Sequence, residues 1–381
     1  MTHRVDCIVG ARPNFMKIAP IMKAFAASGG FETRLIHTGQ HYDVEMNAVF
    51  FDELQIPNPD LNLEIGSGTH TQQTANVMMG LEQAFEANRP DLAVVVGDVN
   101  STLAAALVAA KLQIPLAHVE AGLRSFDRAM PEEINRLITD RVSDLLLTTE
   151  HAAIDQLVSE GVARDAVHFV GNVMIDTLLG SLDRARPASV TIASHDKDGA
   201  FALAAEQGFG FVTLHRPSNV DRPLQLAALL EALNHISQDL PLVFALHPRT
   251  RARFDAERLW DRFDGAEILL TSPLSYLEMI GVMRDAKLAI TDSGGVQEET
   301  TALGVPCLTV RDNTERPITI SEGTNTLVGS SSEALKDAAA RVLAGHSKAG
   351  RIPELWDGHA AERIVRIVDQ YLKAAREHAA A

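Results

Sequence analysis

The sequence is poor in cysteine, and this scarcity limits what can hold the fold together. Only two cysteines occur among 381 residues, Cys7 and Cys307. Each lies in an apolar run typical of a strand, and the two runs belong to different halves of the chain. We therefore expect two buried free thiols rather than a disulfide framework. Free thiols are typical of a reducing compartment, so we expect a cytoplasmic protein.

Long apolar runs and positive charge are also scarce. No apolar run reaches the roughly 18 residues of a membrane-spanning helix, and the opening MTHRVDCIVG has no signal-peptide pattern. Lysine and arginine total 34 against 50 aspartates and glutamates, a net charge of −16. This balance argues against a general nucleic-acid or anionic-membrane surface, although a local basic pocket is compatible with it. We expect neither nucleic acid nor membrane as a partner.

What the sequence does contain is a regular alternation of short apolar runs and helical stretches. The expected strands of the first half are VDCIVG, TRLIHTG, LAVVVGD, PLAHVEAG, DLLLTT and AVHFVGN, and those of the second half are GFVTLH, LVFALH, EILLT, KLAIT and VPCLTV. Helices are expected near residues 14–27, 70–88, 101–112, 132–142, 151–160, 224–238, 275–285, 295–303 and 332–345. The runs show little polar alternation, as parallel strands buried on both faces require. The pattern predicts an α/β fold with doubly wound parallel sheets.

The chain is long enough for two domains of ordinary size. Residues 180–209 lack a strong strand run, so we place the domain junction there. We expect an N-terminal domain over 1–180, a C-terminal domain over 205–358, and a last helix within 359–381 that packs back across the junction. Two such α/β domains would face a cleft, with ligands at the carboxyl ends of the strands.

Acidic side chains follow two of the expected strands in the first half. Asp98 comes directly after LAVVV, and Glu120 closes PLAHVE. An acid beside such apolar runs is poorly solvated, which would raise its proton affinity. Asp98 could instead cap the helix that begins near Ser101. Glu132 and Glu133 begin another helix after a proline, where the helix dipole favours acids in any case.

Basic side chains and histidines follow other strands. Arg12 and Lys17 come after the first strand, where a helix N-terminus also favours an anion. His215 and His247 end two strands of the second half, which suggests contact with a ligand. No close spacing of histidine, cysteine and acidic residues is present, so we expect no metal site.

The stretch ITDSGGVQEETTALGVP, residues 290–306, combines glycines and acids at the start of a helix. Backbone N–H groups around Ser293, Gly294 and Gly295 would suit a diphosphate, since glycine lets the ligand approach the chain. A carboxylate one turn later, at Glu298 or Glu299, could accept hydrogen bonds from a ribose diol. A capped helix with acids in its first turn is the simpler explanation for either acid alone.

Nine ordered blocks resemble one family, the non-hydrolysing UDP-N-acetylglucosamine 2-epimerases. The blocks run from about residue 5 to residue 330: GARPNFMKIAP, TGQHYD, GDVNSTLA, HVEAGLRS, PEEINR, GN followed by VMID, HRPSN, TDSGGVQEE and RDNTERPI. The resemblance implies a glycosyltransferase-B type of fold, with two Rossmann-like domains and the nucleotide mostly on the second. It implies an isomerase that interconverts UDP-N-acetylglucosamine and UDP-N-acetylmannosamine by eliminating UDP and adding it back.

The resemblance also implies roles for individual residues. The positions that match the catalytic residues of the family are Asp98, Glu120, Glu132 and His215. The positions that match residues holding UDP or completing the cleft are Arg12, Lys17, His247, Ser293, Gly294, Gly295, Glu299 and Arg316. Gln40 and His41 match a segment that helps bind a second, activating UDP-N-acetylglucosamine in bacterial members. The family implies a homodimer without metal or other cofactor.

Two departures and several alternatives stay open. The first block reads ARPNF where many members read TRPE, and related epimerases of modified UDP-sugars carry similar forms, so the sugar is undecided. Some members place an aromatic residue beside the uracil near Met279, and whether Tyr276 replaces it is undecided. A hydrolysing 2-epimerase, a glycosyltransferase of the same fold and a non-catalytic UDP-sugar sensor are the competing functions. Three carboxylates beside a diphosphate argue against the sensor, because binding alone does not need them.

Overall fold

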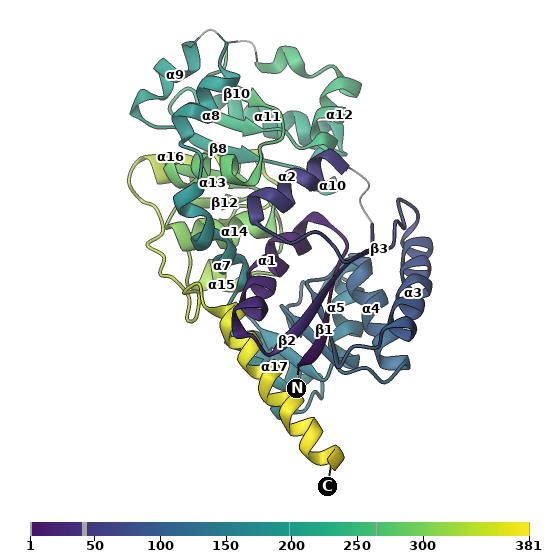
Figure 1. The fold of residues 1–381 in the computed structure, drawn as a ribbon. Helices are drawn as coiled ribbons and strands as arrows, with labels where there is room; N and C mark the ends of the chain where they lie inside the picture. Colours follow the sequence, from purple (N-terminus) through teal and green to yellow (C-terminus); the bar gives the residue numbers. More distant parts are fainter. Residues whose placement is uncertain (1, 40–43, 198, 264, 381) are drawn as a thin grey trace. The chain divides into compact units, whose positions relative to one another are not determined.

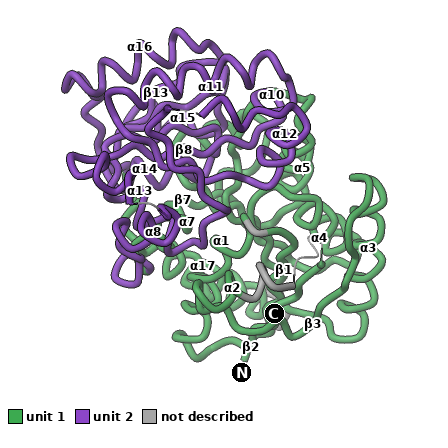
Figure 2. The backbone as a smooth tube through the Cα atoms, turned by 90° about the horizontal axis from the view of Figure 1, so that it is seen from above, with its two compact units in different colours: residues 1–180, 354–381 green, residues 181–353 purple. Residues whose placement is uncertain are grey.

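The computed structural model describes residues 2–39, 44–197, 199–263 and 265–380 (Figure 1). The chain forms two compact units, coloured separately in Figure 2. Unit 1 comprises residues 1–180 and 354–381, and unit 2 comprises residues 181–353.

Unit 1 alternates strands and helices along nearly its whole length. Its strands are β1 (His3–Val9), β2 (Phe31–His37), β3 (Leu61–Asn62), β4 (Leu92–Val96), β5 (Leu116–Val119), β6 (Leu145–Thr148) and β7 (Val167–Phe169). Its helices are α1 (Arg12–Ser28), α2 (Val44–Leu54), α3 (His70–Ala87), α4 (Asn100–Lys111), α5 (Pro131–Val142), α6 (His151–Ser159), α7 (Val173–Ser181, whose last residue is counted in unit 2) and α17 (Ala360–Ala380), with a 3-10 turn η1 (Arg164–Ala166).

The strands of unit 1 form one parallel sheet in the order β3-β2-β1-β4-β5-β6-β7. The order reverses between β1 and β4, which pair in parallel from Val5 opposite Leu92 to Ile8 opposite Val95. Alternate strand residues face opposite sides of a sheet. Ile8, Ile36 and Val95 accordingly share one core with buried residues of α3 and α4.

Unit 2 repeats this construction. Its strands are β8 (Gly210–Thr213), β9 (Leu242–Ala245), β10 (Ile268–Thr271), β11 (Leu288–Thr291), β12 (Cys307–Thr309) and β13 (Asn325–Leu327). Its helices are α8 (Ala188–His195), α9 (Ala200–Ala204), α10 (Pro217–Val220), α11 (Pro223–Ser237), α12 (Pro248–Glu257), α13 (Tyr276–Asp285), α14 (Gly294–Leu303), α15 (Pro317–Ser321) and α16 (Ser332–Leu343), with 3-10 turns η2 (Leu182–Arg184), η3 (Ala205–Gln207) and η4 (Trp260–Phe263).

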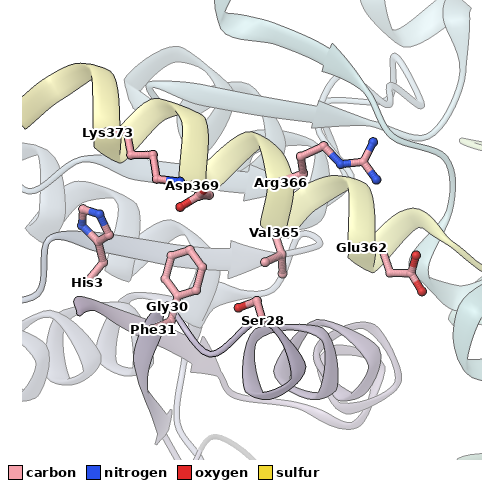
Figure 3. Close-up of a pocket in the computed structure, with 9 residues that line it drawn as sticks. All are labelled: His3, Ser28, Gly30, Phe31, Glu362, Val365, Arg366, Asp369 and Lys373. Atoms are coloured by element: carbon pink, nitrogen blue, oxygen red, sulfur yellow. Dashed lines mark hydrogen bonds and ion pairs between the residues drawn. The ribbon is translucent and has the colours of Figure 1, made fainter. Parts of the chain in front are cut away.

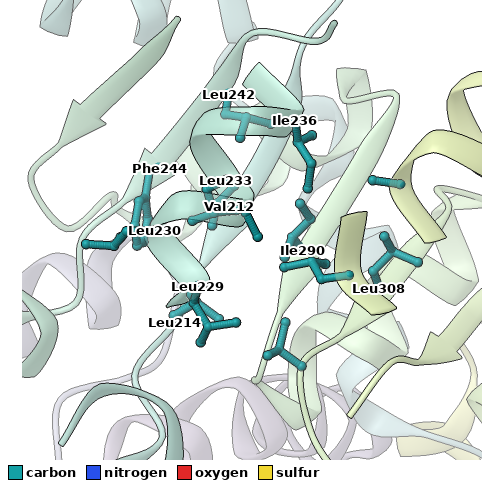
Figure 4. Close-up of a cluster of buried hydrophobic side chains, with 14 of the residues drawn as sticks. Val212, Leu214, Leu229, Leu230, Leu233, Ile236, Leu242, Phe244, Ile290 and Leu308 are labelled. Carbon is teal, nitrogen blue, oxygen red and sulfur yellow. The ribbon is translucent and has the colours of Figure 1, made fainter. Parts of the chain in front are cut away.

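The parallel sheet of unit 2 has the order β10-β9-β8-β11-β12-β13, which reverses between β8 and β11. Consecutive residues of β8 lie in different cores. Val212 packs with Phe244 and Ile290 on the side that α11 and α16 cover, the cluster drawn in Figure 4. Phe211 packs with Val243 on the other side, against residues of α8, α13 and α14. This two-sided burial explains why the strand sequences show no polar alternation.

The chain returns to unit 1 at its C-terminal end. Trp356 is buried and its Nε1 donates to the carbonyl of Thr149 at 3.3 Å. The carboxylate of Asp176 accepts from the backbone N–H groups of Ala360 and Ala361 at 3.1 and 2.7 Å, at the start of α17. Helix α17 then packs against α1.

These observations confirm the predicted fold class, an α/β protein with two Rossmann-like, doubly wound domains, since both sheets follow the Rossmann strand order. All eleven strands expected from apolar runs are present. Cys7 and Cys307 are buried free thiols, as expected. Across the described residues, no helix has both the length and the apolar character that crossing a membrane requires.

Candidate active site

The predicted site residues follow the carboxyl ends of strands on both sides of the reversal in each sheet. In unit 1, Gly10 follows β1 and Asp98 follows β4. In unit 2, His215 follows β8 and Ser293 follows β11. Ligands of open α/β sheets bind where the strand order reverses, outside the carboxyl ends. Each unit therefore has its own group of candidate site residues at this end of its sheet.

Two residues of helix α5 contact Asp98. Arg136 contacts Asp98 Oδ2 with Nε at 3.1 Å and Nη2 at 3.0 Å. Asn135 donates to the Asp98 carbonyl at 2.8 Å. The side chain of Asp98 is 21% exposed. The apolar surroundings expected from the sequence are therefore wrong for this carboxylate, which has a cationic partner and partial access to solvent.

Glu120 is more deeply placed than Asp98. Its Oε1 lies 2.8 Å from Lys17 Nζ, and the side chains are only 2% and 6% exposed, respectively. A Cβ at Gly97 would lie 2.6 Å from the same Nζ, so the glycine makes room for the lysine. Glu120 has a φ of 72°, in the left-handed region that few residues other than glycine adopt. Such conformations persist where surrounding contacts hold them, and they cluster at functional sites.

The adjacent acids of α5 have different environments. Glu132 is half-buried. Glu133 is buried and accepts from the backbone N–H and the hydroxyl of Ser125, both at 2.9 Å, and from the N–H of Phe126 at 3.0 Å. Arg136 Nη1 adds a contact at 2.6 Å. Burial alone would raise the pKa of Glu133, but these donors lower it below its usual value. Glu133 therefore holds the segment before α5, and the ligand role of Glu132 stays a prediction.

A buried network lies behind these acids. His118 contacts Asp140 Oδ1 through Nδ1 at 2.6 Å and the Gly97 carbonyl through Nε2 at 2.8 Å. Both partners are acceptors, so a ring with a proton on each nitrogen satisfies both. Asp140 Oδ2 also accepts from Gly122 N–H at 3.1 Å and lies 2.7 Å from Arg124 Nη2. The network joins the ends of β4 and β5, directly before Asp98 and Glu120.

The turn after β1 is tightly packed. A Cβ at Gly10 would overlap the Ser101 hydroxyl, so the glycine is required by packing inside unit 1. Asn14 Oδ1 accepts from the N–H groups of Gly10 and Ala11 at 3.0 and 3.2 Å. Arg12 is the first residue of α1.

The two residues predicted for an activator, Gln40 and His41, lie outside the described residues.

In unit 2, the backbone and the ring of His215 both contact a buried aspartate, Asp292. Both carboxylate oxygens of Asp292 accept from the His215 backbone N–H at 3.0 Å, and Oδ2 accepts from Arg216 N–H at 2.9 Å. His215 Nδ1 lies 3.1 Å from Asp292 Oδ1. The rings of His215 and His247 are 5.1 Å apart between centroids. The two strand-end histidines therefore lie next to each other, and their contact with a ligand stays a prediction.

The carboxylate of Glu315 lies close to the N-terminus of α14. Ser293 precedes the helix, and Gly294 and Gly295 begin it. Oε1 of buried Glu315 lies 3.0 Å from where a Cβ of Gly294 would be. Arg311 Nη2 contacts the same carboxylate at 2.7 Å. The sequence suggests a diphosphate as the reason for this glycine, and the structure supplies a second reason, the close approach of Glu315.

The two acids of α14 have separate partners. Glu298 lies 2.7 Å from Arg316 Nε, and both side chains are buried. Glu299 accepts from the hydroxyl of Tyr276 at 3.0 Å. Burial, with the charge of Glu298, raises the pKa of Glu299 to about 8 despite the Tyr276 hydrogen bond. Tyr276 is itself buried, with its hydroxyl on Glu299.

Sequence reasoning missed several residues that contact the candidate residues or their neighbours. These are Asn14, Asn135, Arg136, Asp140, Asp292, Arg311 and Glu315. Arg136 had a usable signal, because it lies one helical turn after Glu132 and Glu133. Asp292 also had one, since it directly follows the apolar strand LAIT. Within the described part of the chain, no cluster of three or more histidine, cysteine or acidic residues has the arrangement of a metal site.

The pocket drawn in Figure 3 belongs to a different part of unit 1. It is lined by His3, Phe31 and one side of α17, among other residues, and encloses about 410 Å³. His3 begins β1, whereas Gly10 follows the last residue of β1. The pocket therefore lies at the amino ends of the strands, opposite the carboxyl ends that the predicted site residues follow. Its described lining residues include none of the predicted site residues.

Comparison with known proteins identifies close relatives over the whole chain. A sequence model described as UDP-N-acetylglucosamine 2-epimerase matches residues 23–369. The UDP-N-acetylglucosamine 2-epimerase of Methanocaldococcus jannaschii is 40% identical over 96% of this chain and 98% of its own. The UDP-2,3-diacetamido-2,3-dideoxy-D-glucuronate 2-epimerase of Pseudomonas aeruginosa is 43% identical over 88% of this chain and 91% of its own.

Solved structures agree with these matches. The crystal structure of the M. jannaschii enzyme in complex with UDP-GlcNAc and UDP superimposes with a TM-score of 0.84, covering 96% of this chain and 99% of that one at 40% identity. The UDP-GlcNAc 2-epimerase of Neisseria meningitidis bound to UDP-GlcNAc has a TM-score of 0.84 at 26% identity, covering 96% of this chain and 100% of that one.

Proposed function

This chain belongs to the UDP-N-acetylglucosamine 2-epimerase family, and from this membership we propose that it interconverts UDP-N-acetylglucosamine and UDP-N-acetylmannosamine. The match to the M. jannaschii enzyme over nearly the full length of both chains carries the proposal. No acceptor molecule is consumed in this reaction, which separates it from glycosyl transfer.

The reaction proceeds by elimination and re-addition. A base removes the proton at C2 as the bond between C1 and the UDP oxygen breaks, leaving 2-acetamidoglucal and UDP. UDP then adds back at C1, and an acid delivers a proton to the other face of C2. Two acid/base groups are needed, one for each face. Asp98, Glu120 and Glu132 are the candidates from unit 1, and His215 is the candidate from unit 2.

We assign Lys17 to Glu120 rather than to the nucleotide. The buried ion pair of these two side chains supports this role. It places a positive charge beside a buried acid, and it fixes the carboxylate in one orientation. The developing positive charge on the sugar ring during departure of UDP would be stabilised by nearby carboxylates of this kind.

UDP would be held by residues of unit 2 together with Arg12. The N-terminus of α14, formed by Ser293, Gly294 and Gly295, suits the diphosphate. His247 and Arg316 complete the phosphate contacts, and Glu299 accepts from the ribose. The arginines near Gly294 support this role: Glu315 contacts both Arg216 and Arg311, at 3.4 and 2.7 Å, and Arg316 pairs with Glu298.

A modified UDP-sugar is the second candidate substrate. The P. aeruginosa relative acts on a diacetamido glucuronate and is 43% identical to this chain. That sugar is epimerised at the same carbon, so the same acids would serve. The difference lies in recognition of the groups at C3 and C5.

One experiment separates these possibilities. The purified protein is incubated in heavy water with UDP-N-acetylglucosamine, and in parallel with UDP-2,3-diacetamido-2,3-dideoxy-D-glucuronate. We expect a manno-configured UDP-sugar carrying deuterium at C2. Turnover of the second sugar alone would move the substrate to the modified class. Free N-acetylmannosamine with UDP would indicate a hydrolysing epimerase, and no exchange at C2 of either sugar would reject the proposal.

Three further properties are proposed with this function. The enzyme forms a homodimer, and a second UDP-N-acetylglucosamine, bound with the help of Gln40 and His41, activates it. A sigmoidal dependence of rate on substrate that becomes hyperbolic in Gln40→Ala and His41→Ala variants would support activation. The enzyme is cytoplasmic, for which the two buried free thiols are the support.

A further inference from the structure

The side chain of Asp292 contacts three residues, His215, Arg216 and Asn219. It follows β11 and is fully buried. It accepts from the N–H groups of His215 and Arg216, which follow the neighbouring strand β8, and from Asn219 Nδ2 at 3.0 Å. Its Oδ1 also lies 3.1 Å from Nδ1 of His215. One buried carboxylate thus fixes both the backbone and the ring of the histidine.

The exposure of the two side chains differs sharply. The carboxylate of Asp292 is 0% exposed, whereas the side chain of His215 is 32% exposed. The ring therefore has one edge against a buried acid and part of its surface open. Nε2 lies on the far side of an imidazole from its Nδ1 edge, so it is the nitrogen turned away from Asp292.

The charge state of Asp292 decides which ring nitrogen carries a proton. Burial alone would raise the pKa of Asp292, but the hydrogen bonds and charge of His215, with the donors from Asn219 and Arg216, lower it below its ordinary value. An ionised carboxylate only accepts hydrogen bonds. Nδ1 of His215 must then be protonated to face Oδ1, and Nε2 of the neutral ring bears the lone pair.

The neighbouring histidine has the opposite arrangement. Nδ1 of His247 accepts from the backbone N–H of Arg249 at 3.2 Å, at the start of α12. A nitrogen that accepts bears no proton, so neutral His247 is protonated on Nε2. Two rings whose centroids are 5.1 Å apart are therefore held in different tautomers by their own surroundings.

We propose that Asp292 is a positioning residue that holds His215 as the Nδ1-protonated tautomer and leaves Nε2 to exchange a proton during the reaction. During elimination, Nε2 of the neutral ring takes the proton from C2 as the bond between C1 and the UDP oxygen breaks, and the imidazolium that forms is stabilised by Asp292 without transfer of a proton to that carboxylate. In the reverse direction Nε2 returns the proton. This role rests on the proposed function, in which His215 is one of the acid/base candidates.

The tautomers can be read directly from the protein without substrate. Protein with ¹⁵N-labelled histidine rings is studied by long-range ¹H–¹⁵N correlation above about pH 8, where ordinary histidines are neutral. His215→Gln and His247→Gln variants assign the signals. We expect His215 to be protonated on Nδ1 and His247 on Nε2. A His215 ring protonated on Nε2 in the unmodified protein would overturn the proposal, whatever any variant does.

The Asp292→Asn variant then tests the consequence for catalysis. The amide of the asparagine can donate to Nδ1, which would drive the His215 proton to Nε2 and leave His247 unchanged. We expect kcat to fall by about 10²–10⁴-fold with little change in KM. Adding His215→Gln to Asp292→Asn should cost little more, because the two residues act as one unit. A normal kcat, or losses that multiply in the double variant, would overturn the role.

The two proposals fail in different ways. The expected tautomers without epimerisation of either UDP-sugar would reject the proposed function and leave the Asp292–His215 geometry standing. Epimerisation with an Nε2-protonated His215 would uphold the function and reject the positioning role.

Discussion

Lys17 Nζ lies 2.8 Å from Glu120 Oε1, and the two residues are 103 positions apart in the chain. Both side chains are nearly inaccessible to solvent. Removing one partner of a buried pair leaves the other charge without compensation, which costs far more than removing both. This contact therefore affects both the stability of the fold and the proposed reaction, because Glu120 is also a candidate acid/base group.

Replacing Lys17 by methionine should destabilise the protein by about 3–5 kcal/mol, since the buried carboxylate of Glu120 would lose the ammonium group that lies 2.8 Å from its Oε1. Denaturant unfolding followed by circular dichroism measures this cost. The matched control is Lys17→Met combined with Glu120→Gln, which should recover much of the lost stability. Additive losses in the double variant would mean that the two side chains do not interact as described.

The neighbouring acids Glu132 and Glu133 should respond in opposite ways to the same substitution. Glu132→Gln should lower turnover by about 10²–10⁴-fold with normal unfolding and normal UDP binding, because Glu132 is a half-buried acid/base candidate. Glu133→Gln should instead destabilise the fold by about 1–3 kcal/mol, since a neutral amide cannot satisfy its four donors. Turnover assays, UDP titration calorimetry and thermal unfolding distinguish the two. Near-normal turnover of Glu132→Gln would remove this residue from the mechanism.

The raised pKa of Glu299 predicts a pH-dependent contribution to stability. The folded pKa is about 8 against an ordinary value of 4.5, so the folded state holds a proton that the unfolded state has released. Stability then falls as pH rises between these values, by at most about 1.4 kcal/mol per pH unit for one proton. Because glutamine does not titrate, Glu299→Gln should become more stable relative to the unmodified protein over this range and level off above it. Denaturant unfolding at several pH values provides the comparison, and a difference that stays constant with pH would show that Glu299 is ionised in the folded state.

Two glycines of unit 1 form a matched pair for packing. A methyl group at Gly10 would overlap Ser101 and approach Thr38 Oγ1, whereas nothing lies within 4 Å of the corresponding position at Gly30. We expect Gly10→Ala to destabilise the protein by about 1–3 kcal/mol through overpacking, and Gly30→Ala to be nearly neutral. Thermal unfolding of both variants measures the effect. Equal stability of the two variants would mean that the turn after β1 accommodates the methyl group without loss of stability.

Much of the fold was predictable, because buried parallel strands leave apolar runs that stand out in the sequence. The strands that were missed, Leu61–Asn62 and Asn325–Leu327, are two or three residues long and contain polar side chains. The helix PRTRARFDAE, at Pro248–Glu257, was missed because it buries only Thr250 and Phe254 and so lacks an apolar stripe.

The site was predictable in its positions but not in its partners. Strand ends identify Asp98, Glu120 and His215, since polar residues there are conspicuous after apolar runs. Their partners Arg136, Lys17 and Asp292 come from other segments, and only the folded chain brings them into contact. The apolar surroundings expected for Asp98 were wrong, because the local sequence does not reveal an arginine 38 residues away.

The return of the chain to unit 1 at Glu354 has a consequence for how the protein is made. All residues of unit 2 leave the ribosome as one uninterrupted segment, so this unit can fold during synthesis. Residues 1–180 of unit 1 obtain their final covering only when Trp356 and α17 have been translated, which happens after unit 2. Loss of α17 would therefore damage a part of the enzyme that is synthesised before unit 2.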